Sequence, residues 1–342
     1  MSRIRLAVAA LLASALALTV GAQELKPTLK FKNEKNEFAP VYQEMTTDVV
    51  QVIKVQGQDL TQKQNSTFWF QWTPTKEEKV KEGNDEFTRW TIKQKIEGLK
   101  MDIDISGNPI KYDSRVTDTT GAAGNPGLLD FFKGLKDAEF TVTLGKNYKV
   151  EKVDGKDDFI KRLGANSAQM EALLKKVMTD EALKEMADPT YKLFPDGPKK
   201  KDETWERKAL LPLGPVGTYD LTYKFKYLGP ETAEGPKKGL DKIEVTTIIK
   251  YSAPKDNPEG LLFRIKEGST LESDPEKSKG VIYYDPKNQW IDEATININL
   301  KGNLKVTIGG TDTTAELTQE QKTVIKSKGT SFIEAPKEPP KK

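Results

Sequence analysis

The sequence predicts an α+β protein that is rich in β-structure. We expect a large curved antiparallel sheet or incomplete β-barrel with a helical insertion packed on it. Apolar and polar residues alternate in two long stretches, at about 27–118 and 202–328, as they do in half-buried strands. Between these stretches, at about 125–192, apolar residues recur at helical spacing. Short turns rich in Gly and Asn separate the alternating segments, which favours antiparallel pairing.

The first stretch contains several strand signals. Two long strands are expected at 41–55 and 60–73, joined around Gly57, and another begins near Trp90. From Leu99 to Ile105, apolar residues alternate with Lys and Asp, which indicates a half-buried strand. A turn at Gly107-Asn108-Pro109 and a second alternating run then predict a hairpin.

The middle segment has amphipathic helices. Asn125 is expected to cap a helix that begins at Pro126, and a strand pair follows at 140–144 and 148–153. Three more helices are expected to begin at Asp157, Ser167 and Thr179. Pro189 should end the last of them. The apolar sides of these helices need a surface to cover, and we expect them to pack on the concave side of the sheet.

The second stretch places large side chains at every second position. They form one row on one face of a predicted strand: Tyr219, Leu221, Tyr223, Phe225 and Tyr227. Strands are also predicted at 243–251 and 296–308. The motifs at 35–38 and 287–290 are similar and each precedes a long hairpin, which is explained either by a duplicated β unit or by two hairpins of similar composition; the second explanation is favoured.

The composition removes several classes of chemistry. The 342 residues include no His and no Cys, which excludes thiol nucleophiles, disulfides, imidazole-based triads and zinc sites made of thiolate or imidazole. The 54 basic and 51 acidic residues nearly balance, so no general attraction to nucleic acid is expected. No calcium loop, Walker loop or dinucleotide fingerprint is present, and we predict no cofactor and no metal.

The first 22 residues have the pattern of a secretory signal. Two Arg precede the apolar run 6–20, and small residues lead to an expected cleavage after Ala22. We therefore expect an exported protein, periplasmic or extracellular, with no transmembrane segment after cleavage. The mature chain should comprise one β-rich domain over 23–332 and a disordered tail over 333–342 that is rich in Pro and Lys.

An aromatic cluster at 68–72 is the most unusual local feature. Alternation places Phe68, Phe70 and Trp72 on one strand face and Trp69 on the other. The plain interpretation is core packing on one side and helix contact on the other. The sharper interpretation makes the aromatic residues a ligand platform, and the candidate ligand-binding residues are then Trp69, Trp72, Tyr223 and Phe225.

Three segments resemble a family of uncharacterised exported proteins of planctomycete-type bacteria. They lie at 43–74, 95–114 and 186–229, and they include TTDVVQVIKV, KMDIDISGNPIKYD and TYDLTYKFKYLG. The resemblance implies export and one continuous unit, and it brings no activity, cofactor or functional residue with it.

These observations lead to one main functional hypothesis and two alternatives. A curled sheet with helices on it leaves an apolar groove, a shape similar to that of bacterial lipoprotein carriers. The main hypothesis is a non-catalytic exported protein that binds a lipid or another hydrophobic or amphipathic ligand there. The first alternative is a structural or interaction protein of the cell envelope, partnered by an envelope protein. The second is a hydrolase that uses two carboxylates.

Overall fold

The structure is a computed structural model that describes residues 24–116, 126–165, 167–187, 193–255, 263–308 and 310–333. Several sequence predictions lie outside these ranges. They are the signal sequence with its cleavage after Ala22, the cap at Asn125, the helix end at Pro189 and the tail beyond residue 333.

The described chain is dominated by one antiparallel sheet of 14 strands. The strands of the first half are β1 (Val41–Val55), β2 (Gln58–Glu82), β3 (Asp85–Ile105), β4 (Asn108–Asp113), β5 (Glu139–Leu144) and β6 (Val150–Asp154). Those of the second half are β7 (Thr204–Pro212), β8 (Thr218–Pro230), β9 (Asp241–Ser252), β10 (Phe263–Ile265), β11 (Thr270–Ser273), β12 (Lys279–Asp285), β13 (Trp290–Ile308) and β14 (Thr311–Lys328). The helices are α1 (Pro126–Leu135), α2 (Lys156–Gly164), α3 (Ala168–Val177) and α4 (Asp180–Ala187).

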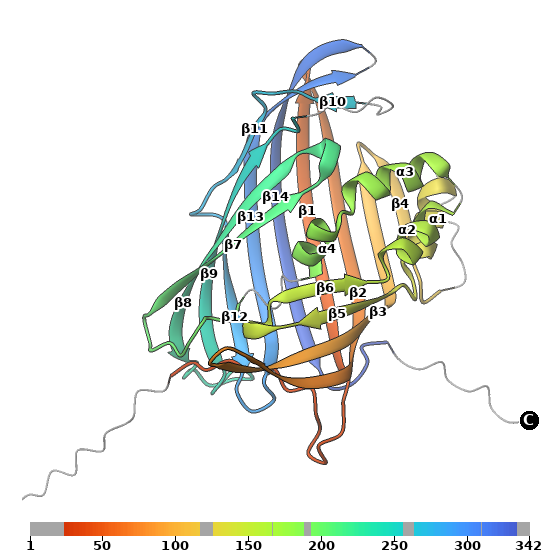
Figure 1. Ribbon diagram of the computed structural model, residues 1–342. Coiled ribbons are helices and arrows are strands. Elements are labelled where there is room, and N and C mark those ends of the chain that lie inside the picture. Colours follow the sequence, from red (N-terminus) through yellow and green to blue (C-terminus); the bar gives the residue numbers. More distant parts are fainter. Residues whose placement is uncertain are drawn as a thin grey trace, which may run out of the picture.

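The sheet curves strongly but does not close into a barrel (Figure 1). Its main path runs β6-β5-β3-β2-β1-β14-β13-β11-β9-β8-β7, so β6 and β7 are the two free edges. The helices lie on the concave side, and α4 packs against both β6 and β7. A short helix therefore stands between the two free edges of the sheet. The predicted fold class, with its helical insertion on the sheet, is confirmed.

The individual elements follow the sequence pattern closely. Ser167 and Thr179 cap α3 and α4, since their hydroxyl oxygens accept hydrogen bonds from the backbone N–H groups of Met170 and Ala182. One prediction is corrected. The segments that begin near Trp90 and at Leu99 belong to the single strand β3, because a bulge opposite the pair Trp69 and Phe70 absorbs the break in alternation.

The two faces of the central strands differ in charge. The concave positions are the odd-numbered residues from Gln43 to Val55 and from Ala315 to Ser327, and the even-numbered residues from Leu60 to Trp72 and from Ala294 to Val306. None of these side chains is charged. The convex positions between them hold Lys, Glu, Asp and Asn. Alternation has thus assigned the ionic groups of these strands to the outside.

The largest apolar cluster joins the two halves of the sequence. It contains Trp72 and Trp90 from the first half, Phe225 and Ile325 from the second, and Leu25 from the N-terminal segment. Burial of these large side chains supplies most of the driving force for folding, at about 25 cal/mol for each Å² of apolar surface. Residues from both sheet edges contribute to the same cluster, so the incomplete barrel has a continuous core at its wider end.

Candidate functional site

A cavity of about 340 Å³ lies between the concave face of the sheet and α4. None of the described residues around it carries a charge. The lining residues are Gln43, Met45, Thr47, Phe70, Trp72, Gln94, Met186, Ala187, Leu193, Tyr223, Phe225, Val245, Thr247, Ile282, Ile291, Ala294, Ile296, Ile298, Gln321, Thr323 and Ile325. The volume is at the lower end of the range for small-molecule sites, roughly 300–1,000 Å³.

Strand register explains why apolar groups gather in the middle of this cavity. Ile282 of β12 pairs with Ala294 of β13, and Ala294 pairs in turn with Ile325 of β14. Ile325 then pairs with Met45 of β1. Residues paired directly across antiparallel strands point to the same face, so this row forms an apolar floor. Phe225 of β8, paired with Val245 of β9, extends the apolar lining toward the β7 edge.

Uncharged polar groups border the apolar floor. Thr323 of β14 shares a hydrogen bond with Thr47 of β1, with the two hydroxyl oxygens 3.3 Å apart. The side-chain amide of Gln321 donates to the Thr323 hydroxyl at 3.2 Å and accepts from Gln319 at 3.3 Å. These groups form a hydrogen-bonded band along β14 and β1 beside the apolar floor.

Thr247 of β9 differs from the other polar residues of the lining. The residue is 1% exposed, and its Oγ1 has no hydrogen-bond partner among the described residues. Its backbone is satisfied, because the N–H donates to the carbonyl of Ser278 and the carbonyl accepts from the Ser273 hydroxyl. A buried hydroxyl without a partner is unfavourable and rare in folded proteins, so this atom needs an explanation.

Helix α4 contributes to the cavity only through its last two residues, Met186 and Ala187. Met186 lines the cavity and is nevertheless 50% exposed, so its side chain lies where the cavity meets solvent. Methionine is unbranched and adapts to different neighbours, which suits a residue at an entrance. The helix is held in place at its start by the Thr179 cap and by the buried side chains of Ala182 and Leu183.

The N-terminal segment crosses the wider end of the incomplete barrel. The hydroxyl of Tyr284 accepts from the N–H of Thr28 at 2.9 Å and donates to its carbonyl at 2.7 Å. The hydroxyl of Tyr148 accepts from the N–H of Leu29 at 3.0 Å. Thr28 thus lies between a tyrosine of β12 and one from the β5–β6 connection, and the segment bridges distant parts of the sheet.

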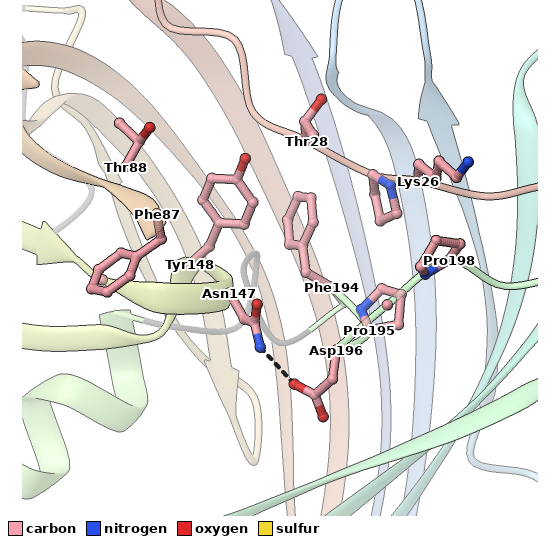
Figure 2. A pocket seen from close by; sticks show the side chains of 13 residues that line it. Lys26, Thr28, Phe87, Thr88, Asn147, Tyr148, Phe194, Pro195, Asp196 and Pro198 are labelled. Carbon is pink, nitrogen blue, oxygen red and sulfur yellow. Dashed lines mark hydrogen bonds between the residues drawn. The ribbon is translucent and has the colours of Figure 1, made fainter. Parts of the chain in front are cut away.

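A second pocket of about 350 Å³ lies outside this crossing segment (Figure 2). Asp196 is one of its lining residues. Arg207 of β7 donates to both carboxylate oxygens of Asp196 at 2.9 Å, and the amide of Asn147 donates to one of them at 2.8 Å. The Arg207 guanidinium holds the pKa of Asp196 below its usual range. These contacts tie β7 to the β5–β6 connection, so we interpret this pocket as a structural seam between the sheet edges.

Three of the four predicted site residues line the cavity. Trp72, Tyr223 and Phe225 face it from β2 and β8, as alternation predicts. Trp69 lies on the convex face, where its indole N–H donates to Glu44 at 2.9 Å and the Arg115 guanidinium lies 4.4 Å from the ring centre. The predicted helix contact at Trp69 is therefore wrong, because the helices cover the opposite face.

Two important lining features were missed from the sequence. Thr247 is part of an alternating strand and has no feature that distinguishes it from its neighbours in the sequence. Gln321 lies in a polar run that is typical of a strand exposed to solvent. Their common signal is the lack of charge at every second position of β1, of β14, and of β9 from Ile243 onward, which a count along each strand face would have found. The part of α4 that faces the cavity could not be recognised because its partner surface comes from strands distant in sequence.

One buried carboxyl group lies near the wider end of the sheet. Asp241 is 3% exposed, and the Tyr227 hydroxyl donates to it at 2.6 Å. Burial raises the pKa of Asp241 above its ordinary value, and it also raises the pKa of Tyr227. Asp241 does not line the cavity described above, and that cavity has no Asp or Glu among its described lining residues. It therefore does not supply the two facing carboxylates that glycoside hydrolysis uses.

Among the residues that the structure describes, no group of His, Cys, Asp or Glu is arranged to hold a metal ion. Within the same part of the chain, no helix combines the length and apolarity that crossing a bilayer requires.

A family model described as a family of unknown function, DUF6263, matches residues 88–252. This agrees with the resemblance to an uncharacterised family, while the planctomycete-type origin stays a prediction. None of the curated proteins matches the sequence.

The solved structures that are similar to this chain match it with low TM-scores. Lipovitellin, in a structure that concerns lipid–protein interactions, has a TM-score of 0.39 and 11% identity over 90% of this chain; this chain spans 26% of the lipovitellin chain. DynF from Micromonospora chersina has a TM-score of 0.20 and 10% identity; the match covers 90% of this chain and 86% of the DynF chain. OccK7 of Pseudomonas aeruginosa has a TM-score of 0.17 and 8% identity; the match covers 86% of this chain and 100% of the OccK7 chain.

Proposed function

We propose that this protein is a non-catalytic binding protein that holds a hydrophobic or amphipathic molecule between the concave face of its sheet and α4. The observation that carries the proposal is the cavity of about 340 Å³ whose described lining is apolar at its centre and uncharged throughout. Protein interiors normally pack without voids of this size, because empty space forfeits dispersion contacts and costs stability. A cavity built from large apolar side chains is consistent with filling by a ligand.

The lining residues support binding rather than catalysis. Trp72, Phe225 and Tyr223 offer broad faces to an apolar molecule, and Met186 can adapt its side chain where the ligand would enter. A carrier of this kind needs no acid, base or nucleophile. We further propose that the protein is exported after cleavage behind Ala22, which would place the cavity where lipids and other amphiphiles need a shield from water.

Native mass spectrometry of protein purified from the envelope or periplasm of its host tests this function. We expect a protein peak with an added mass that disappears in organic solvent. Substitution of Ala294 by Phe should remove most of this added mass, because Ala294 is 3% exposed and lies in the cavity floor.

Thr295→Phe provides the matched control. Thr295 is the next residue of β13 and points to the convex face, so the same introduced phenyl ring should leave the added mass in place. A bare protein mass in the wild type, or equal added mass in both variants, would contradict the proposed function. A co-purifying protein in place of a small molecule would favour the structural alternative.

A further inference from the structure

We infer that the ligand is a neutral amphiphile, with an apolar chain over the cavity floor and an uncharged hydrogen-bonding headgroup against Thr247 and a patch of glutamines. The inference rests on the proposed function and names the chemical class of the ligand. It is carried by the unpartnered Thr247 hydroxyl and by the distribution of charge over the concave face.

The glutamine patch is the set of five half-buried glutamines next to the cavity on the concave face. Its members are Gln51 of β1, Gln62 and Gln64 of β2, and Gln319 and Gln321 of β14. Gln51 pairs directly with Gln62 on one side and with Gln319 on the other. Gln321 also lines the cavity, so the patch continues the cavity wall without interruption.

Thr247 lies at the same level of the sheet as the nearest glutamine. Its N–H donates to the carbonyl of Ser278, and Ser278 is hydrogen-bonded to Asn299 of β13. The residue beside Asn299, Ile298, pairs with Gln321. Thr247 and Gln321 therefore border the cavity on the same side of its apolar floor. Both residues line the same cavity, and the hydroxyl and amide groups that they offer are both donors and acceptors.

The chemistry of this region selects against charge. A carboxylate, phosphate or ammonium group that enters a wall without ionic partners loses hydration and gains no counter-charge, which is strongly unfavourable. A hydroxyl or amide headgroup loses less hydration and regains hydrogen bonds from Thr247 and the glutamines. The Thr247 hydroxyl gains a partner that the described residues do not provide. Over the central stretches of β1, β2, β13 and β14, the charged residues point to the convex face. Arg207 of β7 shares the concave face with Tyr223 and Thr247, but its guanidinium already donates to Asp196 and to the carbonyl of Phe194.

Isothermal titration calorimetry with three probes of equal chain length tests the inference. The probes are 1-dodecanoylglycerol, dodecanoate and dodecyltrimethylammonium, each below its micelle concentration and added to delipidated protein. We expect the neutral glycerol ester to bind at least about tenfold more tightly than either charged probe, since an unpaired buried charge costs more than a paired hydroxyl.

Thr247→Val should weaken binding of the neutral probe by about three- to tenfold, the range expected for one hydrogen bond. Thr246→Val is the matched control, because Thr246 is the preceding residue of β9 and faces the convex side. If the Thr247 variant unfolds, Gln321→Leu examines the same headgroup position from β14. The thermal unfolding of each variant is measured without ligand to separate binding from stability.

The outcomes separate this inference from the proposed function. Equal affinity for all three probes, or no effect of either Thr247→Val or Gln321→Leu on the neutral probe, overturns the neutral-headgroup inference while the binding function stands. Such a result would mean that the headgroup stays in solvent and that only water meets the Thr247 hydroxyl. Failure of all three probes to bind overturns the proposed function and this inference with it.

Discussion

At the residue scale, the surroundings of a polar side chain decide its effect on folding stability more than its chemical type does. Asp241 and Asp196 are both carboxyl groups near the wider end of the sheet, yet their pKa values move in opposite directions. Burial disfavours the charged form of Asp241, whereas Arg207 favours the charged form of Asp196. The same side chain therefore opposes folding at neutral pH in one place and supports it in another.

The pair of Asp241 and Tyr227 gives a pH prediction. Because the pKa of Asp241 is raised by folding, its contribution to stability is complete below the ordinary value near 4 and is lost as pH rises through the raised value. Asp241→Asn should therefore remove this loss. In urea unfolding at pH 4 and pH 7, we expect the variant to gain on the order of 1 kcal/mol relative to wild type at the higher pH.

Tyr227→Phe serves as the companion variant. It removes the hydroxyl that donates to the Asp241 carboxylate, so stability should fall more steeply with pH than in the wild type. Parallel pH profiles for wild type and Asp241→Asn would show that the ionisation of this carboxyl does not differ between the folded and unfolded states.

At the element scale, the open edges of the sheet are managed by contacts that are not strand pairs. Unpaired edge strands invite association with other chains, and this fold covers the gap between β6 and β7 with α4 and with the seam around Asp196 (Figures 1 and 2). The seam joins Arg207 of β7 to Asn147, which lies just before β6. It acts where no backbone ladder connects the two edges.

Removal of the seam should loosen both edges together. Asp196→Ala is expected to lower the free energy of unfolding by about 1 kcal/mol at neutral pH, a modest value because the carboxylate is largely exposed to water. Hydrogen–deuterium exchange of β6 and β7 should increase. Since Arg207 lowers the pKa of Asp196, the stabilisation is present above the ordinary value near 4 and is lost as pH falls through the lowered value.

Glu139→Ala is the control for this effect. Glu139 pairs with Lys93 between β5 and β3, two strands that are already joined by a backbone ladder. Loss of that ion pair should change exchange at β7 little. If both variants affect β7 equally, the contact at Asp196 has no special role at the gap.

At the scale of the whole molecule, the chain order and the sheet order do not coincide. Residues 88–252, which the family model matches, supply most of β3 and then β4 to β9. The strands β2, β1, β14, β13 and β11 lie between β3 and β9 in the sheet, and all five come from outside this segment. The largest apolar cluster likewise uses residues from both sides of it.

This arrangement predicts that the matched segment does not fold alone. A fragment of residues 88–252 lacks the centre of the sheet, so its two groups of strands have no partner between them. We expect no cooperative thermal transition for the fragment by circular dichroism, whereas the chain from 24 to 333 should show one. A sharp transition in the fragment would show instead that the two flanks can pair without the centre.

Local elements were predictable because their causes are local. Alternation identified β1, β8 and β9, and the side-chain caps at Ser167 and Thr179 marked the starts of α3 and α4. Alternation alone also predicted the strand face on which Trp72, Tyr223 and Phe225 lie, and this is the face that lines the cavity. The continuity of β3 did not, because a bulge shifts the register and breaks the pattern that would reveal one strand.

The sequence by itself determined the β-rich class, the positions of most elements and the face of each strand that avoids charge, because these depend on residues two to four positions apart. Tertiary structure decided which strands are neighbours, and therefore which uncharged faces meet. Only that arrangement brings Thr247, Gln321 and Met186 around one cavity and places Trp69 outside it. The physical reason is that pairing between distant strands depends on packing and hydrogen bonding across the whole sheet, which no local pattern encodes.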